Sequence, residues 1–129
     1  MRKHLDQACG WLLVLGACGH TGGTLLWLPR MSDIWIWSLG SALAAMVLGA
    51  LNLLRASRED DRALAWITTL GTACWGLVAV AFGVSIGNML DPRPLMHAVV
   101  SLLLVGYSLA TLLRTQRLET SHSDVPVST

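Results

Sequence analysis

Apolar residues fill four long segments of the chain, and polar residues gather between these segments and at the two ends. The segments cover residues 9–28, 34–54, 63–87 and 95–113. The hydrocarbon core of a bilayer is about 30 Å thick, so a helix that rises about 1.5 Å per residue crosses it with about 20 apolar residues. Each segment therefore predicts one transmembrane helix.

The connections between the four segments are short, and short connections join helices that lie side by side and antiparallel. The pattern predicts an all-α membrane protein: an up-down-up-down bundle of four transmembrane helices in a single domain, residues 1–113. The tail over residues 114–129 contains few large apolar residues, so we predict that it is disordered and cytoplasmic.

Residues that end or begin helices stand at the borders of the apolar segments. Pro29 is expected to end the first helix, because proline continues a helix poorly. Ser32 or Asp33 is placed to cap the second helix, and Asp91, which prolines follow, is placed to cap the fourth. These positions agree with the borders that hydrophobicity predicts.

The segment between the second and third helices is strongly charged. Arg55 and Glu59 are four residues apart, and Glu59 and Arg62 are three apart, so both pairs share a helix face. We interpret this segment as a solvated extension of the second helix that carries weak surface ion pairs.

Basic residues are distributed unevenly among the loops. With the N-terminus inside, seven of the nine Lys and Arg residues are cytoplasmic, and only Arg30 and Arg93 are outside. Cytoplasmic loops of membrane proteins carry an excess of Lys and Arg, so the distribution predicts that both termini are inside. The expected location is the bacterial inner membrane.

Composition limits the classes of function. Hydrophobic residues make up 53% of the 129-residue chain, and its mean hydropathy is +0.57, which leaves no room for a soluble catalytic domain. The cysteines number three, at positions 9, 18 and 74, and an odd count argues against a disulfide framework. No nucleophile–base set, phosphate loop or nucleic-acid patch is recognisable, so the sequence favours a protein that is not an enzyme and has no nucleic-acid partner.

Each predicted helix carries a stripe of small or polar residues at helical spacing. Such residues let membrane helices approach closely and form hydrogen bonds across their interfaces. We therefore expect the stripes to face inward. The predicted packing residues are Gly16, Gly19, Gly23, Ala45, Gly49, Ala79, Gly83 and Gly87.

His20 is the most unusual residue of the four spans, because it is ionisable and lies near the middle of the first. An ionisable group at this depth is costly and is a functional-site hypothesis by default. The structural interpretation is a neutral histidine that is hydrogen-bonded to a serine or threonine of a neighbouring helix, and Ser41 and Ser101 have a comparable predicted depth. Both interpretations place His20 in the interior.

A second histidine, His97, raises the hypothesis of a haem held between the first and fourth helices. Two ligands of one iron must lie at nearly the same depth. His20 is about eight residues from the outer end of its helix and His97 only two or three, so at about 1.5 Å per residue the mismatch is about 8 Å. The sequence identifies no metal site, and haem stays open as a cofactor.

No predicted span contains an acidic residue, whereas ion-coupled transporters commonly place a carboxylate in the membrane. In length and number of spans the chain resembles the small multidrug resistance transporters. That family depends on a glutamate in the first span, and the corresponding place here is apolar or His20. The resemblance therefore lacks the residue that carries the activity.

The sequence as a whole favours a structural or accessory membrane protein that acts through helix contacts, in the lipid bilayer, as a homo-oligomer or in a larger membrane complex. The alternative is a small transporter or redox carrier that uses His20, with Ser41, Ser101 and His97 lining a polar interior.

Overall fold

The computed structural model describes residues 2–123, and all of its regular structure is helical. The elements are α1 (Arg2–Trp27), α2 (Asp33–Ser57), α3 (Arg62–Ser85) and α4 (Pro92–Ser123). Each helix contains a segment long and apolar enough to cross a membrane. The four predicted helices are therefore confirmed.

Two helices extend well beyond the predicted spans. α1 begins at Arg2 rather than at residue 9, and α4 continues to Ser123 rather than ending at 113. Residues 114–123 of the predicted tail are thus part of α4, and residues 124–129 lie outside the described part of the chain. An apolar segment marks the part of a helix that suits lipid, whereas Gln, Arg, Leu and Glu, which are good helix formers, continue α4 past that part.

Side-chain caps define the starts of three helices. Ser32 Oγ accepts a hydrogen bond from the Trp35 amide at 3.3 Å, and Asp91 Oδ1 accepts one from the Arg93 amide at 2.9 Å. Both residues were predicted caps. Asp61 caps α3 in the same way, accepting from the Leu64 amide at 2.9 Å. Each cap satisfies a backbone donor that has no partner within its helix.

Asp91 also forms a two-pronged ion pair with Arg93, whose Nε and Nη2 donate to its two carboxylate oxygens at 2.9 and 2.8 Å. Hydrogen bonds from the side chain and the backbone of Arg93 lower the pKa of Asp91 from 3.8 to about 2. Because the folded pKa is lowered, the stabilisation is complete above about pH 4 and is lost as the pH falls towards 2.

We expect a carboxyl titration of Asp91, followed by NMR in micelles, to show a midpoint near 2. Arg93→Gln should move this midpoint upward, only part of the way to 3.8, because the backbone hydrogen bond remains. An unchanged midpoint in Arg93→Gln would contradict the assignment of the pKa shift to this ion pair.

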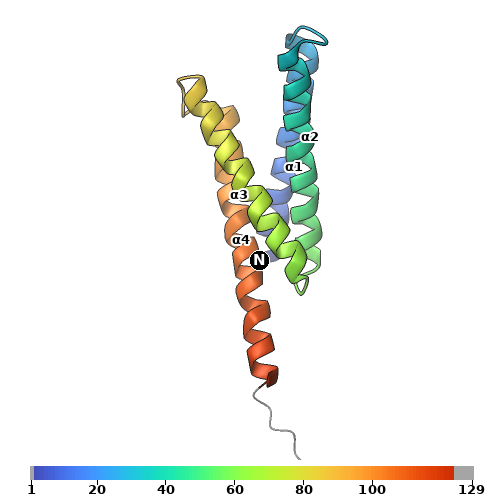
Figure 1. Ribbon diagram of the computed structural model, residues 1–129, viewed down its shortest axis with the longest axis vertical. Coiled ribbons are helices and arrows are strands. Elements are labelled where there is room, and N and C mark those ends of the chain that lie inside the picture. The colour runs from blue at the N-terminus through green and yellow to red at the C-terminus, as the bar shows by residue number, and fades with distance from the viewer. Residues whose placement is uncertain (1, 124–129) are drawn as a thin grey trace, which may run out of the picture.

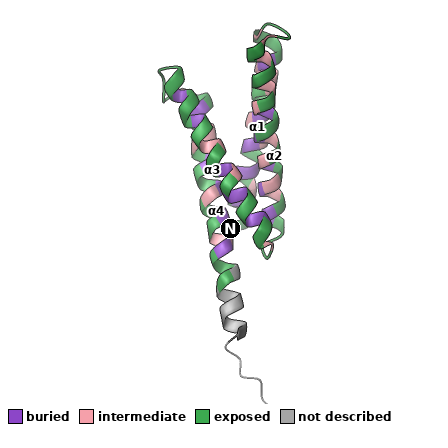
Figure 2. Ribbon diagram, in the orientation of Figure 1, coloured by how far each residue is buried: buried purple, intermediate pink, exposed green. Residues whose placement is uncertain are grey.

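The helices form two hairpins, α1–α2 and α3–α4, which meet at one end and splay apart at the other (Figure 1). We call the end with the N-terminus and the 58–61 loop the closed end, and the end with the loops 28–32 and 86–91 the open end. Buried residues concentrate where the hairpins meet, and the two arms of the open end are largely exposed (Figure 2).

Small residues allow the close contacts of the core. A Cβ added at Gly49 of α2 would lie 3.1 Å from the Gly10 carbonyl oxygen and 3.1 Å from the Val14 nitrogen of α1, so the two backbones touch. The core where the hairpins meet is a cluster of buried apolar side chains from α1, α2 and α4. Its members are Cys9, Leu13, Ala17, Ala45, Val100 and Leu104.

Candidate functional site

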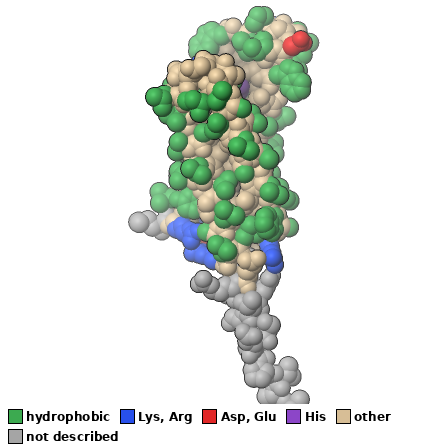
Figure 3. Space-filling model, turned by 60° about the vertical axis from the view of Figure 1, so that its left-hand side comes forward, with side chains coloured by type: hydrophobic (Ala, Val, Ile, Leu, Met, Phe, Trp, Pro, Cys, Tyr) green, Lys and Arg blue, Asp and Glu red, His purple; other side chains and the backbone are tan. Residues whose placement is uncertain are grey.

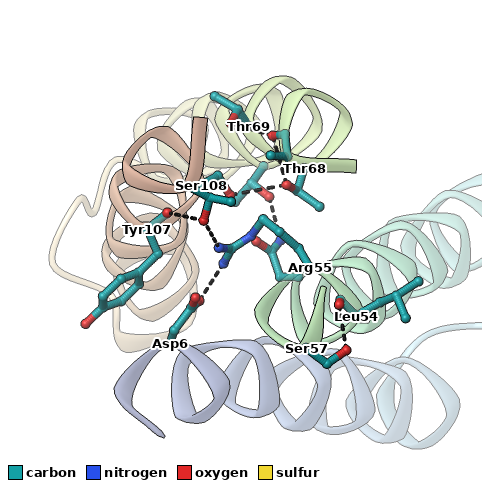
Figure 4. Close-up of polar contacts among 12 residues, drawn as sticks. Asp6, Leu54, Arg55, Ser57, Thr68, Thr69, Tyr107 and Ser108 are labelled. Carbon is teal, nitrogen blue, oxygen red and sulfur yellow. Dashed lines mark hydrogen bonds and ion pairs between the residues drawn. The ribbon is translucent and has the colours of Figure 1, made fainter. Parts of the chain in front are cut away.

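The most deeply buried charged side chain of the described chain is Arg55, at the closed end. Its side chain is 1% exposed, and its Nη2 donates to Asp6 Oδ1 of α1 in an ion pair. Its Nη1 donates to Thr111 Oγ1 of α4 at 3.3 Å. Figure 4 shows the guanidinium of Arg55 directed toward Asp6. A single guanidinium therefore joins α2 to one helix of its own hairpin and to one helix of the other.

Two further buried hydrogen bonds lie near Arg55. Asn52 Nδ2 of α2 donates to Thr72 Oγ1 of α3 at 2.8 Å, and the hydroxyls of Thr68 and Ser108 join α3 to α4 at 3.2 Å. We call this set the polar ladder. It consists of Asp6, Asn52, Arg55, Thr68, Thr72, Ser108 and Thr111, and it connects all four helices.

The polar ladder corrects two sequence predictions. Asp6 is part of α1 and is buried, so an acidic residue does lie within a helix that is long enough to span a membrane. Arg55 pairs with Asp6 rather than with Glu59, which instead lies 3.6 Å from Arg114. The predicted pair was wrong because the prediction compared only residues of one helix, whereas the partner of Arg55 lies on α1.

Helical spacing contained a signal for this ion pair. Asp6 precedes the core residues Cys9 and Leu13 by three and seven positions, and Arg55 follows Asn52 of the polar stripe by three. Residues at these spacings share one helix face. The inward stripe of α1 therefore extends to the acidic Asp6, and that of α2 extends to the basic Arg55.

His20 lies on α1 towards the open end, and its side chain is exposed. Its Nε2 is 3.0 Å from Ser38 Oγ of α2, and Ser38 Oγ is 2.6 Å from Thr24 Oγ1. A serine of a neighbouring helix does bond this histidine, but it is Ser38 instead of Ser41 or Ser101. The expectation of an interior position was wrong for the single chain, because the second hairpin splays away from this part of α1.

His97 lies on α4 and packs against α1. Its Nδ1 accepts a hydrogen bond from Trp75 Nε1 at 3.4 Å, and the two rings meet edge to face with centroids 5.7 Å apart. Its Cε1 and Nε2 lie 3.1 and 3.3 Å from where a Cβ of Gly16 would be. His97 is therefore level with Gly16, one turn closer to the closed end than His20.

This placement reverses the predicted depths of the two histidines. Counting from helix ends had placed His20 deeper, whereas His97, in the second turn of α4, lies beside Gly16, three turns before α1 ends. The count assumed that the two hairpin tips are level. The α3–α4 hairpin is instead set back towards the closed end.

The arrangement does not suit a haem held by both histidines. Ser38 occupies His20 Nε2, and Trp75 occupies His97 Nδ1, so an iron would have to displace the Ser38 contact or take the other nitrogen of His20. Residues 2–123 also contain no group of three or more His, Cys, Asp or Glu side chains that could hold a metal ion.

The two candidate serines lie apart from His20. Ser41 is partly buried, and its hydroxyl donates to the Trp37 carbonyl of its own helix at 2.9 Å. Ser101 is 1% exposed and faces α3, where its Cβ lies 3.2 Å from the position of a Gly76 Cβ. Its hydroxyl has no hydrogen-bond partner among the described residues.

The predicted packing residues divide by position along the bundle. Gly16 and Gly49 are covered by a neighbouring helix, Gly83 by Met89 and Pro94, and Ala45 and Ala79 are buried. The other three are not covered by another helix. A Cβ at Gly19 would have no neighbour within 4 Å, one at Gly23 would meet only Trp27 of α1, and Gly87, with φ +66, lies in the turn after α3.

The glycines of the α1 stripe thus continue past Gly16, the glycine that contacts α4. Gly16 touches Met96 and His97, whereas Gly19 and Gly23, which lie within about 60° of the same direction on the helix, have no such neighbour. The open end therefore presents a face of glycines beside a polar His20, with no covering helix among residues 2–123.

These features define the class as a small all-helical protein with four helices that could cross a membrane and with buried hydrogen bonds from α2 of one hairpin to α3 and α4 of the other. Comparison with protein families, with curated proteins and with solved structures gives no significant match.

Proposed function

We propose that this protein is an accessory subunit of the bacterial inner membrane, with antiparallel helices and both termini in the cytoplasm. It holds its two hairpins together at the closed end and receives a transmembrane helix of another chain at the open end. Basic side chains gather at the closed end, below a surface covered by apolar side chains, which supports this orientation (Figure 3).

The uncovered glycine face of α1 is the observation that carries the proposal. Lipid gives membrane helices little hydrophobic reason to associate, so small residues and hydrogen bonds provide the contacts. Gly19 and Gly23 leave room for a backbone to approach, and the exposed imidazole of His20 offers a hydrogen-bonding group beside them. A helix with a small, partly polar face fits this surface better than acyl chains do.

The alternative of a transporter or redox carrier gains no comparable support. That hypothesis needs His20, Ser41, Ser101 and His97 around one polar interior. Instead, His20 bonds to Ser38, Ser41 bonds to its own helix and Ser101 faces α3.

Purification from the native membrane in a mild detergent, with mass spectrometry of everything that co-purifies, tests the proposal. We expect a stoichiometric partner, which is either a second copy or a larger complex. A stable monomer without any partner would contradict it.

A substitution at the open end sharpens this test. Gly19→Leu should reduce the recovered partner at least tenfold, because the leucine fills the space that a partner helix needs. It should leave the monomer's melting temperature nearly unchanged, since the added Cβ would have no described atom within 4 Å apart from its chain neighbours and the adjacent backbone of α1. Gly106→Leu on α4 is the matched control, because Gly106 is equally free of neighbours but lies away from the open end. Equal partner recovery in both variants would exclude the glycine face as the docking surface.

A further inference from the structure

A polar pocket of about 210 Å³ opens at the closed end, between α1, α2 and α4. Four basic residues contribute to its lining, and two acidic residues accompany them. These are Arg2, Lys3, Arg55 and Arg114, with Asp6 and Glu59. We call this the basic pocket. None of the functions considered above uses it.

The charges of the basic pocket do not balance. Four positive and two negative side chains leave a formal charge of +2. Both acids are already engaged, Asp6 with Arg55 and Glu59 with Arg114 at 3.6 Å. Arg2 and Lys3 are exposed and form no ion pair with any described residue. The pocket therefore has cationic donors available for an anion from outside the chain.

The position of the pocket indicates the kind of anion. Its lining residues belong to the closed end, where Lys and Arg side chains gather below the apolar surface of the helices (Figure 3). Leu5 and Leu113, each adjacent in sequence to a residue that lines the basic pocket, are 53% and 66% exposed. A ligand at this level has an apolar surface on one side and cations on the other, which matches the acyl chains and the phosphate of a phospholipid.

We propose that the basic pocket binds the phosphate of an anionic phospholipid. Arg2 and Lys3 supply charge-assisted hydrogen bonds to the phosphate oxygens, and Arg114 completes the cationic wall. Arg55 is paired with Asp6, and Arg114 with Glu59, so the formal charge of +2 corresponds to Arg2 and Lys3. Basic pockets between transmembrane helices recognise anionic headgroups in the same way. This inference does not depend on a partner at the open end.

Native mass spectrometry of the full chain in micelles that contain equal amounts of phosphatidylglycerol and phosphatidylcholine tests the proposal. The wild type should retain phosphatidylglycerol at least fivefold over phosphatidylcholine. Arg2→Gln with Lys3→Gln should abolish this preference, and both residues are exposed, so the fold is expected to persist. Arg30→Gln with Arg93→Gln is the matched control, since it removes the same charge at the open end and should keep the preference.

Inorganic phosphate distinguishes a lipid site from a site for a soluble anion. We expect phosphate at millimolar concentration to leave the bound phosphatidylglycerol in place, because it cannot contact the apolar flank. Displacement of the lipid by phosphate at an equal concentration would overturn the lipid assignment. Equal retention of the two lipids by the wild type, or an equal loss of preference in the two double variants, would overturn the site itself.

Discussion

Asp6→Leu is expected to lower the free energy of unfolding by about 3 kcal/mol, because it leaves the Arg55 guanidinium buried without its counter-ion. The Arg55 side chain is 1% exposed, and its Nε already has no hydrogen-bond partner among the described residues, so the protein has little means to compensate. Arg55→Met should lower the free energy of unfolding by a similar amount, since it leaves the Asp6 carboxylate, whose side chain is 10% exposed, without its ion-pair partner.

The double variant Asp6→Leu with Arg55→Met distinguishes an ion pair from two independent packing effects. Apolar side chains of similar volume often replace a buried ion pair at little cost, so the double variant should be more stable than either single variant. Unfolding in mixed micelles, followed by far-UV circular dichroism, measures all three. Arg58→Met, which changes an exposed arginine, should stay within about 0.5 kcal/mol of the wild type. Additive losses in the double variant would contradict the proposed coupling.

Gly49→Val is expected to destabilise the α1–α2 hairpin by about 1–3 kcal/mol, the usual range for overpacking. Even a Cβ at this position would lie 2.7 Å from Val14 Cγ2 and 3.1 Å from two backbone atoms of α1. A side chain could rotate away, but the backbone cannot, so the two helices have to separate.

Gly40→Val is the matched control on the same helix, because a Cβ at Gly40 would have no neighbour within 4 Å. This substitution should be neutral or slightly stabilising, since valine favours a helix more than glycine does. The same unfolding assay measures both. Equal effects at the two positions would mean that α1 and α2 do not approach closely at Gly49.

The sequence predicted some parts of the fold well because their causes are local. Pro29 marks the end of the first helix, and the caps at Ser32 and Asp91 were predicted correctly because each cap bonds a backbone amide two or three residues away. The glycine of the α1–α2 contact, Gly49, was also among the predicted packing residues. Membrane helices need small residues wherever their backbones touch, so the stripe indicates the contact face.

The candidate site was predicted less well because its partners come from distant parts of the chain. The partner of His20 is eighteen residues away in Ser38, and that of Arg55 is forty-nine away in Asp6. The depth of His97 was misjudged for the same reason, since it depends on how far one hairpin is set back against the other. The spacing of residues on one helix determines neither the offset between the hairpins nor the angle at which they splay apart.

The order of apolar and polar residues by itself determined that this chain forms four helices, that each is long enough to cross a bilayer, and which face of each carries small or polar side chains. These properties follow from helical periodicity and from the hydrophobicity of single segments. Only the tertiary structure decided that Asp6 and Arg55 form a buried pair, that the hairpins meet at one end only, and that part of the α1 stripe stays uncovered. Those outcomes depend on the packing of whole helices against one another, because a side chain finds its partner only after two helices take a common register and angle.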